Sequence, residues 1–156
     1  MRMPRIHAAL ILILLSLSLN SCVLSPEKKI DSVYVMVYDY ENNEVMNVSI
    51  SIDGKKIGTT DIYGRLIITP DDEKESTVRA EKDGYESVET KAYIRPGQLV
   101  YFRMGTGAYY AKMAEQLLDG DEPDKALELI DRALEIQDRK DWRYLRSVIL
   151  RRLSDE

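Results

Sequence analysis

The apolar residues of this chain follow three different spacings. Residues 8–19 are almost all apolar. Residues 31–104 form short runs in which apolar and polar side chains alternate, as in strands with one buried face. Residues 105–153 place apolar side chains three and four positions apart, as on one face of a helix. The pattern therefore predicts an N-terminal targeting segment, a group of strands and a group of helices.

The alternating region predicts about seven short strands. In its first run, Val33, Val35 and Val37 occupy every second position. Turn sequences such as Asp53-Gly54 separate the runs, because glycine supplies the backbone angles that tight turns need. We expect the strands near residues 33–38, 48–52, 56–60, 65–69, 77–81, 87–94 and 99–104. Short strands at this spacing are typical of a small antiparallel sandwich.

Three apolar stripes mark the helical region. The first two are separated by Gly120 and Pro123, and proline is favoured in the first turn of a helix. The stripes consist of Tyr109, Tyr110, Met113, Ala114, Leu117 and Leu118; of Ala126, Leu127, Leu129, Ile130, Ala133, Leu134 and Ile136; and of Trp142, Leu145, Ile149 and Leu153. We therefore expect three helices after the strands.

The strand region carries a turn motif. Its sharpest part is Thr60-Asp61-x-x-Gly64, followed twenty residues later by Gly84-Tyr85. Over most of residues 32–104 the sequence resembles the carboxypeptidase regulatory-like domain and the related PEGA domain. The resemblance implies a transthyretin-like sandwich with a binding or accessory role and without peptidase residues. We expect Asp61 to cap the turn that Gly64 closes, and the ring of Tyr85 to lie across an edge of the sandwich.

The helical region resembles a tetratricopeptide repeat. The packing positions that carry this resemblance are Tyr110, Ala114, Leu117, Ala126, Ile130 and Ala133. Asp138 stands where the repeat usually has proline, and one repeat with one further helix is too short for a solenoid, which needs about three repeats. The helices therefore pack either on the sandwich or on a partner. The fold expected is α+β: a small antiparallel, transthyretin-like sandwich over residues 31–104, then a three-helix, repeat-like segment over residues 105–156.

The N-terminal segment has the features of a secretory signal peptide. Arg2 and Arg5 precede the apolar run, which is too short for a membrane span of about 20 residues. The run ends in Leu19-Asn20-Ser21-Cys22, which resembles a bacterial lipobox. The resemblance implies cleavage between Ser21 and Cys22 and a diacylglyceryl group on Cys22. We expect a signal peptide over residues 1–21 and a lipidated tether over residues 22–30.

A lipid on Cys22 predicts export and attachment to a membrane of the cell envelope. In the Gram-negative sorting pattern that accompanies the lipobox, aspartate after the cysteine favours the inner membrane. Val23 stands there, so the outer membrane is favoured. The alternative is a secreted protein whose single cysteine is a free thiol.

Composition excludes several classes of function. The formal net charge is −5 and becomes more negative when Arg2 and Arg5 are removed, so the chain lacks the basic surface that nucleic-acid binding needs. One cysteine permits no disulfide within the chain. The only histidine, His7, lies in the signal peptide, which excludes histidine-based nucleophilic dyads and histidine or cysteine zinc sites from the mature chain. We expect no enzymatic activity, no cofactor, no metal site and no nucleic-acid partner.

Two acidic runs are the remaining candidates for cation binding. They are residues 71–73 and 119–122, and neither has the spacing of an EF-hand loop. We interpret the first as a solvated loop and the second as the end of one helix and the cap of the next.

The candidate partner-binding residues lie in the helical region: Tyr109, Tyr110, Trp142, Arg143 and Arg146. The last helix is basic, and residues 119–138 before it are acidic. The favoured interpretation is complementary charge between adjacent helices. The alternative is a docking surface for an acidic partner or for lipid headgroups.

A second candidate surface lies on the first strand. Tyr34, Met36 and Tyr38 share the face opposite the valines. We favour helices covering this face; the alternative is an exposed aromatic patch that binds glycan or peptide. The function predicted is that of a non-enzymatic envelope lipoprotein that binds or scaffolds a protein partner. The alternative is a lipoprotein that binds the cell wall or a glycan through aromatic residues of the sandwich.

Overall fold

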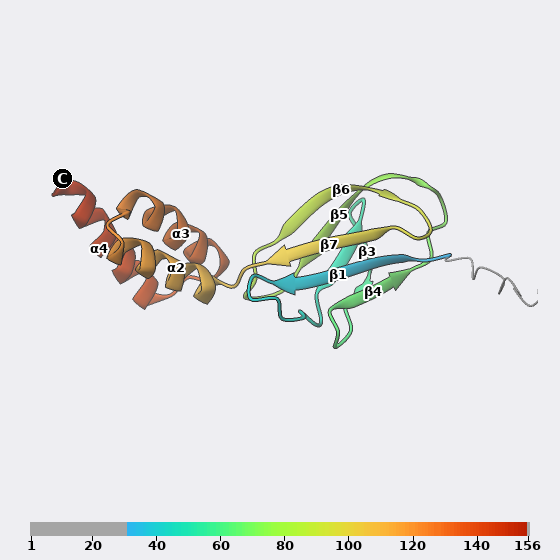
Figure 1. Ribbon diagram of the computed structural model, residues 1–156, viewed down its shortest axis with the longest axis horizontal. Coiled ribbons are helices and arrows are strands. Elements are labelled where there is room, and N and C mark those ends of the chain that lie inside the picture. The colour runs from blue at the N-terminus through green and yellow to red at the C-terminus, as the bar shows by residue number, and fades with distance from the viewer. Residues whose placement is uncertain (1–30, 156) are drawn as a thin grey trace, which may run out of the picture. The chain divides into compact units, whose positions relative to one another are not determined.

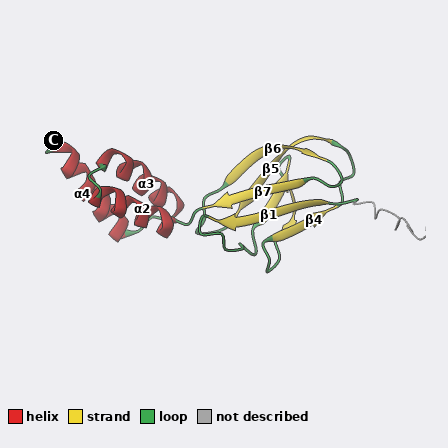
Figure 2. Ribbon diagram, viewed as in Figure 1, coloured by secondary structure: helices red, strands yellow, loops and turns green. Residues whose placement is uncertain are grey.

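The computed structural model describes residues 31–155, in which seven strands precede three helices (Figure 1). The strands are β1 (Val33–Asp39), β2 (Ser49–Ile52), β3 (Lys55–Thr59), β4 (Arg65–Ile68), β5 (Lys74–Glu81), β6 (Val88–Ile94) and β7 (Leu99–Met104). The helices are α2 (Gly107–Asp119), α3 (Pro123–Ile136) and α4 (Lys140–Ser154). The predicted α+β class, with a sandwich followed by helices, is confirmed (Figure 2). The predicted signal peptide, lipid site and tether lie outside the described residues.

The strands form two sheets, with orders β4-β1-β7 and β3-β2-β5-β6. Every pair is antiparallel except β1 with β7, which is parallel. The exception to the expected antiparallel sandwich arises because the turn after β6 crosses between the sheets. It brings the chain back beside the start of β1, where the Gly97 N–H donates to the Ser32 carbonyl at 2.9 Å. Strand β7 therefore runs in the same direction as β1.

The inward residues of both sheets form one core. The valines of the first run are fully buried, as the alternation predicted, and the same holds for Ile50, Val78 and Met104. The buried members of this core are Val33, Val35, Val37, Val45, Val48, Ile50, Ile68, Val78, Ala80, Ile94, Val100, Phe102 and Met104. All of them precede the helices in the sequence, so the sandwich has a core of its own.

The turn between β3 and β4 has the predicted cap. One carboxylate oxygen of Asp61 accepts hydrogen bonds from the N–H groups of Tyr63 and Arg65, each at 2.9 Å. The hydrogen bond from the Arg65 backbone contributes most to lowering the pKa of Asp61. Gly64 has φ +66°, and a Cβ there would lie 2.4 Å from the Val37 carbonyl oxygen. Only glycine therefore fits this turn.

The helices have a second core, and its small residues allow close packing. Ala114, Ala126 and Ala133 are fully buried, as expected for residues between adjacent helices. Gly107 serves the same purpose at the start of α2, since a Cβ there would lie 2.7 Å from the Trp142 ring. Pro123 begins α3 as predicted. No helix within residues 31–155 is both long enough and apolar enough to span a membrane.

Candidate binding surface

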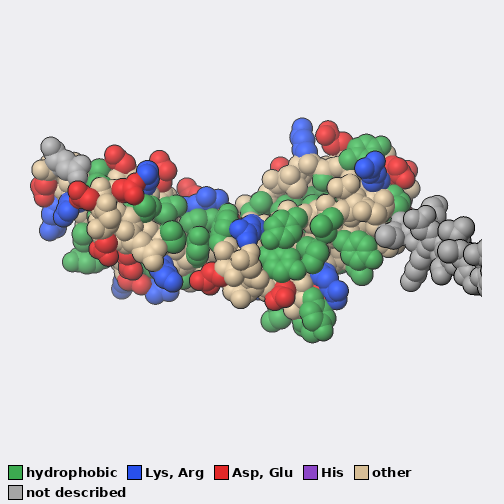
Figure 3. Space-filling view, viewed as in Figure 1, with side chains coloured by type: hydrophobic (Ala, Val, Ile, Leu, Met, Phe, Trp, Pro, Cys, Tyr) green, Lys and Arg blue, Asp and Glu red, His purple; other side chains and the backbone are tan. Residues whose placement is uncertain are grey.

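The outer face of the β4-β1-β7 sheet is aromatic and aliphatic. Because the inward positions of these strands fill the core, the alternate positions point outward. The register places Ile67, Tyr34 and Leu99 in one row across the sheet, and Met36 and Tyr101 in the next. We call this surface the tyrosine face, and it consists of Tyr34, Met36, Tyr38, Ile67, Leu99 and Tyr101. Figure 3 shows hydrophobic side chains gathered over these strands.

Much of the tyrosine face is open to solvent. The exposed fractions are 57% for Ile67, 51% for Leu99, 49% for Tyr101 and 37% for Tyr34. The rings of Tyr38 and Tyr101 stack, with centroids 5.6 Å apart. The expectation that helices cover this face is therefore wrong. The helices turn their apolar stripes toward one another and bury them in their own core, which leaves the sheet face uncovered.

The outer face of the other sheet is different. Its outward positions on β5 and β6 include Arg79, Glu81, Glu89 and Lys91, all exposed. Arg79 and Glu81 form an ion pair at 2.8 Å. Tyr93, 50% exposed, is an aromatic residue among these charges. The two outer faces therefore differ in chemistry, and the apolar one is the candidate for binding.

Two arginines border the tyrosine face. Arg65 lies on β4, where it pairs with Asp61 at 3.3 Å and its guanidinium carbon lies 4.6 Å from the centroid of the Tyr63 ring. Arg103 lies on β7 and donates to the Tyr101 hydroxyl at 3.4 Å. Both strands are at edges of their sheet. The surface thus has an apolar centre, with an Arg65–Asp61 ion pair on one side and Arg103 on the other.

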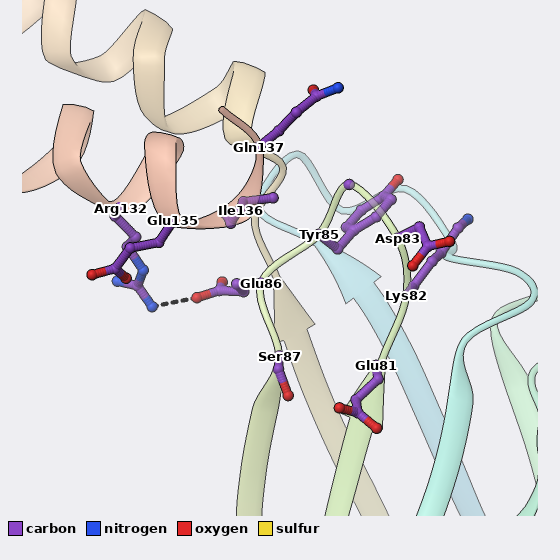
Figure 4. Close-up of a pocket in the computed structure, with 11 residues that line it drawn as sticks. Glu81, Lys82, Asp83, Tyr85, Glu86, Ser87, Arg132, Glu135, Ile136 and Gln137 are labelled. Carbon is purple, nitrogen blue, oxygen red and sulfur yellow. Dashed lines mark hydrogen bonds and ion pairs between the residues drawn. The ribbon is translucent and has the colours of Figure 1, made fainter. Parts of the chain in front are cut away.

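The start of α2 contacts the sandwich through one buried carboxylate. Glu86 follows the turn between β5 and β6 and is 6% exposed. Its Oε1 accepts hydrogen bonds from the Gly105 N–H and the Tyr110 hydroxyl, both at 2.6 Å, and its Oε2 pairs with Arg132 of α3 (Figure 4). Burial and the bond to Glu86 raise the pKa of Tyr110. In addition, the ring of Tyr40 stacks on Tyr109 at 5.2 Å.

An open cleft of about 780 Å³ lies beside Glu86. It is formed by the β5–β6 turn and the C-terminal end of α3, and Figure 4 shows its charged side chains. Those side chains are Glu81, Lys82, Asp83, Glu86, Arg132 and Glu135. Three donors occupy the Glu86 carboxylate, so this group links the sandwich to the helices. Sequence reasoning did not single out Glu86, because a glutamate after a turn gives no signal of burial.

The five predicted partner-binding residues do not form one surface. Tyr110 and Trp142 are 4% and 7% exposed, so their prediction as binding residues is wrong: both rings fill the helical core. Tyr109 is half-buried under Tyr40. Arg143 pairs with Asp138 at 3.2 Å, and Arg146 pairs with Asp131 at 2.5 Å.

The ion pairs of α4 support the interpretation of complementary charge. Besides Arg143 and Arg146, Arg152 pairs with Asp121 of the acidic segment at 2.9 Å. At the start of α4, the hydrogen bond from the Arg139 side chain contributes most to lowering the pKa of Asp141. Much of the positive charge of α4 is therefore matched within the chain. Among residues 31–155, no group of three or more histidine, cysteine or acidic side chains is placed to hold a metal ion.

Comparisons with known proteins do not assign the chain to a family. No protein-family model and no curated protein matches the chain. The chain is similar to part of the Bacillus anthracis TIE protein, with a TM-score of 0.41 and 13% identity over 50% of this chain and 17% of that one. For the 3-chlorocatechol 1,2-dioxygenase from Rhodococcus opacus 1CP the TM-score is 0.35, with 13% identity over 53% of this chain and 63% of that one. The chain thus spans less than two thirds of either protein. Likenesses this weak carry no argument about function, and the resemblances to the regulatory-like, PEGA and tetratricopeptide families stay predictions.

Proposed function

We propose that this chain is a non-enzymatic, lipid-anchored protein of the cell envelope that binds a protein partner through the tyrosine face. The observation that carries the proposal is the contrast between the two sheets: one outer face is aromatic and aliphatic, the other charged. Contiguous apolar patches on a protein surface mark interaction sites more often than chance. Tyrosine, methionine and arginine are also enriched where proteins meet.

The composition of the face favours a protein over other ligands. Ile67 and Leu99 flank Tyr34, and Met36 lies beside Tyr101. Aliphatic side chains pack well against an apolar patch on another protein. Arg103 borders that centre on β7 and suits a carboxylate at the rim of the partner, whereas the charge of Arg65 is offset by Asp61. The partner expected is therefore a protein whose apolar patch has an acidic residue at its rim.

The lipid anchor rests on the sequence around Cys22. A tether over residues 22–30 spans at most about 30 Å when extended, which keeps the sandwich close to the bilayer. Stable attachment takes more than one lipid chain, as a diacylglyceryl group provides. Replacing Cys22 by serine should leave unprocessed precursor without lipid. Normal processing and lipid labelling of that variant would contradict the proposed site.

The binding face is tested with matched tyrosines on the two sheets. Tyr101 and Tyr93 are 49% and 50% exposed, and they lie on the outer faces of different sheets. The photo-crosslinking residue p-benzoylphenylalanine is placed at either position in the full chain, and native membranes are irradiated. We expect one protein to be captured from position 101 and not from position 93, identified by mass spectrometry and then purified. Its affinity for the Tyr101→Ser chain should be about tenfold weaker than for the Tyr93→Ser chain.

Two outcomes would count against a protein partner. Equal capture from both positions would show that the tyrosine face is not selective. A captured protein that binds the Tyr101→Ser chain as well as the unchanged chain would place the interface elsewhere.

A glycan is the second candidate ligand of the same face. The ring of Tyr101 is 49% exposed and stacks on Tyr38, so it offers a supported aromatic surface for a sugar ring. Co-sedimentation with purified cell wall is the test. Binding that Tyr101→Ser abolishes and Tyr93→Ser leaves intact, without a captured protein, would favour the glycan.

A further inference from the structure

The end of the sandwich where β1 begins contains a pocket with an aliphatic interior and charged residues around it. Its volume is about 530 Å³, within the range of small-ligand sites. Four isoleucines from four strands line it: Ile52 of β2, Ile57 of β3, Ile68 of β4 and Ile94 of β6. The pocket is separate from the tyrosine face, whose side chains point outward from the β4-β1-β7 sheet.

The buried part of the lining is aliphatic except for Ser76, and the charged side chains of the lining are exposed. Ile68 and Ile94 are 8% and 4% exposed, whereas Ile57 stands at the mouth with 40% exposed. Ser76 also lines the pocket and is 3% exposed. Within the described part of the chain, its hydroxyl has no hydrogen-bond partner of normal geometry. Among residues 31–155, no aromatic side chain lines the pocket. Such a lining suits a flexible aliphatic chain better than an aromatic ring or a sugar.

The rim disfavours an anionic head. Lys74 is paired with Asp53 at 3.2 Å, so these two charges offset each other. The other charged residues of the lining are Asp71, Asp72 and Lys55, which leaves an excess of negative charge. A free fatty acid would bring its carboxylate to this rim. The chain of a larger lipid would instead enter by its methyl end and leave the head outside.

We propose that this pocket holds the acyl chain of a membrane lipid. This inference rests on the proposed lipid anchor, which keeps the sandwich close to the bilayer. Val33 at the start of β1 pairs with Ile68 of the pocket. The described chain therefore begins at the end of the sandwich that carries the pocket, and the nine residues back to Cys22 reach at most about 30 Å when extended. The acyl chain comes either from a phospholipid of the bilayer or from the anchor itself.

Photo-crosslinking of the full chain tests the pocket and separates the two sources. In one arm the protein is placed in vesicles of phosphatidylethanolamine and phosphatidylglycerol that contain a phosphatidylethanolamine with a diazirine in its acyl chain. In the other arm cells are grown on a diazirine fatty acid, so that the anchor carries the label, and the vesicles are unlabelled. We expect crosslinks on the peptides that contain Ile57 and Ile68. The first arm indicates phospholipid as the source, and the second indicates the anchor.

Matched variants make the result specific. Ile57→Asp places a charge at the mouth and should lower the yield of pocket crosslinks by about tenfold, because an apolar chain does not pack against an ionised group. Ile62, 70% exposed and outside the pocket, supplies the control Ile62→Asp, which should leave the yield unchanged. Circular dichroism checks that both variants fold.

The experiment can refute acyl-chain binding in the pocket and lipid attachment at Cys22 separately. The intact mass of the mature protein reports lipid on Cys22 whatever the pocket holds. A lipidated protein without pocket crosslinks in either arm would overturn the acyl-chain inference and leave the anchor intact. Pocket crosslinks that Ile57→Asp does not reduce would also overturn it. An unlipidated protein that still crosslinks through the pocket to the labelled phospholipid would refute the anchor and support the pocket.

Discussion

Replacing Glu86 by alanine should destabilise the protein where the helices contact the sandwich. The carboxylate accepts hydrogen bonds from the Gly105 N–H and the Tyr110 hydroxyl and pairs with Arg132. Alanine removes all three interactions and leaves Gly105 and Tyr110, both buried, without this acceptor. The effect is therefore expected to exceed that of losing a surface ion pair.

The magnitude follows from the contacts. A buried donor left without an acceptor costs about 1–3 kcal/mol, and Glu86→Ala leaves two of them. The Arg132 side chain is 49% exposed, so water screens its ion pair, which contributes at most about 1 kcal/mol. Water entering from the adjacent cleft restores part of the loss. We expect Glu86→Ala to lower the free energy of unfolding by about 3 kcal/mol.

Two further variants divide this effect. Glu86→Gln keeps an oxygen for Gly105 and Tyr110 but loses the charge that faces Arg132, so it should cost about 1–2 kcal/mol. Arg132→Ala removes only the ion pair and the contact with the Tyr110 ring, where the guanidinium carbon lies 4.6 Å from the centroid, and should cost about 1 kcal/mol.

Urea unfolding of the full chain, followed by circular dichroism, measures these differences. The expected order of destabilisation is Glu86→Ala, then Glu86→Gln, then Arg132→Ala. Equal losses for Glu86→Ala and Arg132→Ala would refute the reasoning, because the buried donors would then contribute nothing. A change in the slope of the free energy of unfolding against urea concentration would instead show that the sandwich and the helices unfold separately.

Three other predictions follow from the structure. Gly64→Ala should cost about 2 kcal/mol or more in urea unfolding, since its Cβ would meet the Val37 carbonyl in a left-handed backbone; an unchanged midpoint would contradict the tight turn. A chain that ends at Met104 should keep cooperative thermal unfolding, because every buried residue of the sandwich core precedes its end; a molten product would show that the helices complete that core. Stability should fall as the pH rises above about 10, because burial raises the pKa of Tyr110 and the unfolded state releases its proton first; Tyr110→Phe should flatten this alkaline limb in pH-dependent urea titrations.

The local elements could be predicted because their determinants are close together in the sequence. The alternation in β1 fixed which residues point inward, and Asp61 and Gly64 define their turn within four residues. The alanines of α2 and α3 marked where two helices approach. In each case the spacing alone carries the information, since strands and helices repeat with fixed periods.

The candidate surfaces could be predicted only in part. The sequence placed Tyr34, Met36 and Tyr38 on one face of a strand but did not show whether anything covers it. It also suggested Tyr110 and Trp142 as binding residues, because an aromatic residue on a helix looks the same in the sequence whether it is buried or exposed. Only the packing of the helices against one another decided that these two rings are core and that the strand face is open.

By itself, then, the sequence determined the strands, the helices, the capped turn and the resemblance of residues 19–22 to a lipobox. Tertiary structure decided which surface is open, how Glu86 is held and where the isoleucine pocket forms. The donors to Glu86 come from residues 19, 24 and 46 positions away, and the pocket joins side chains of four strands. Such features depend on contacts between segments that are distant in the sequence. A local pattern of apolar and polar residues does not determine those contacts.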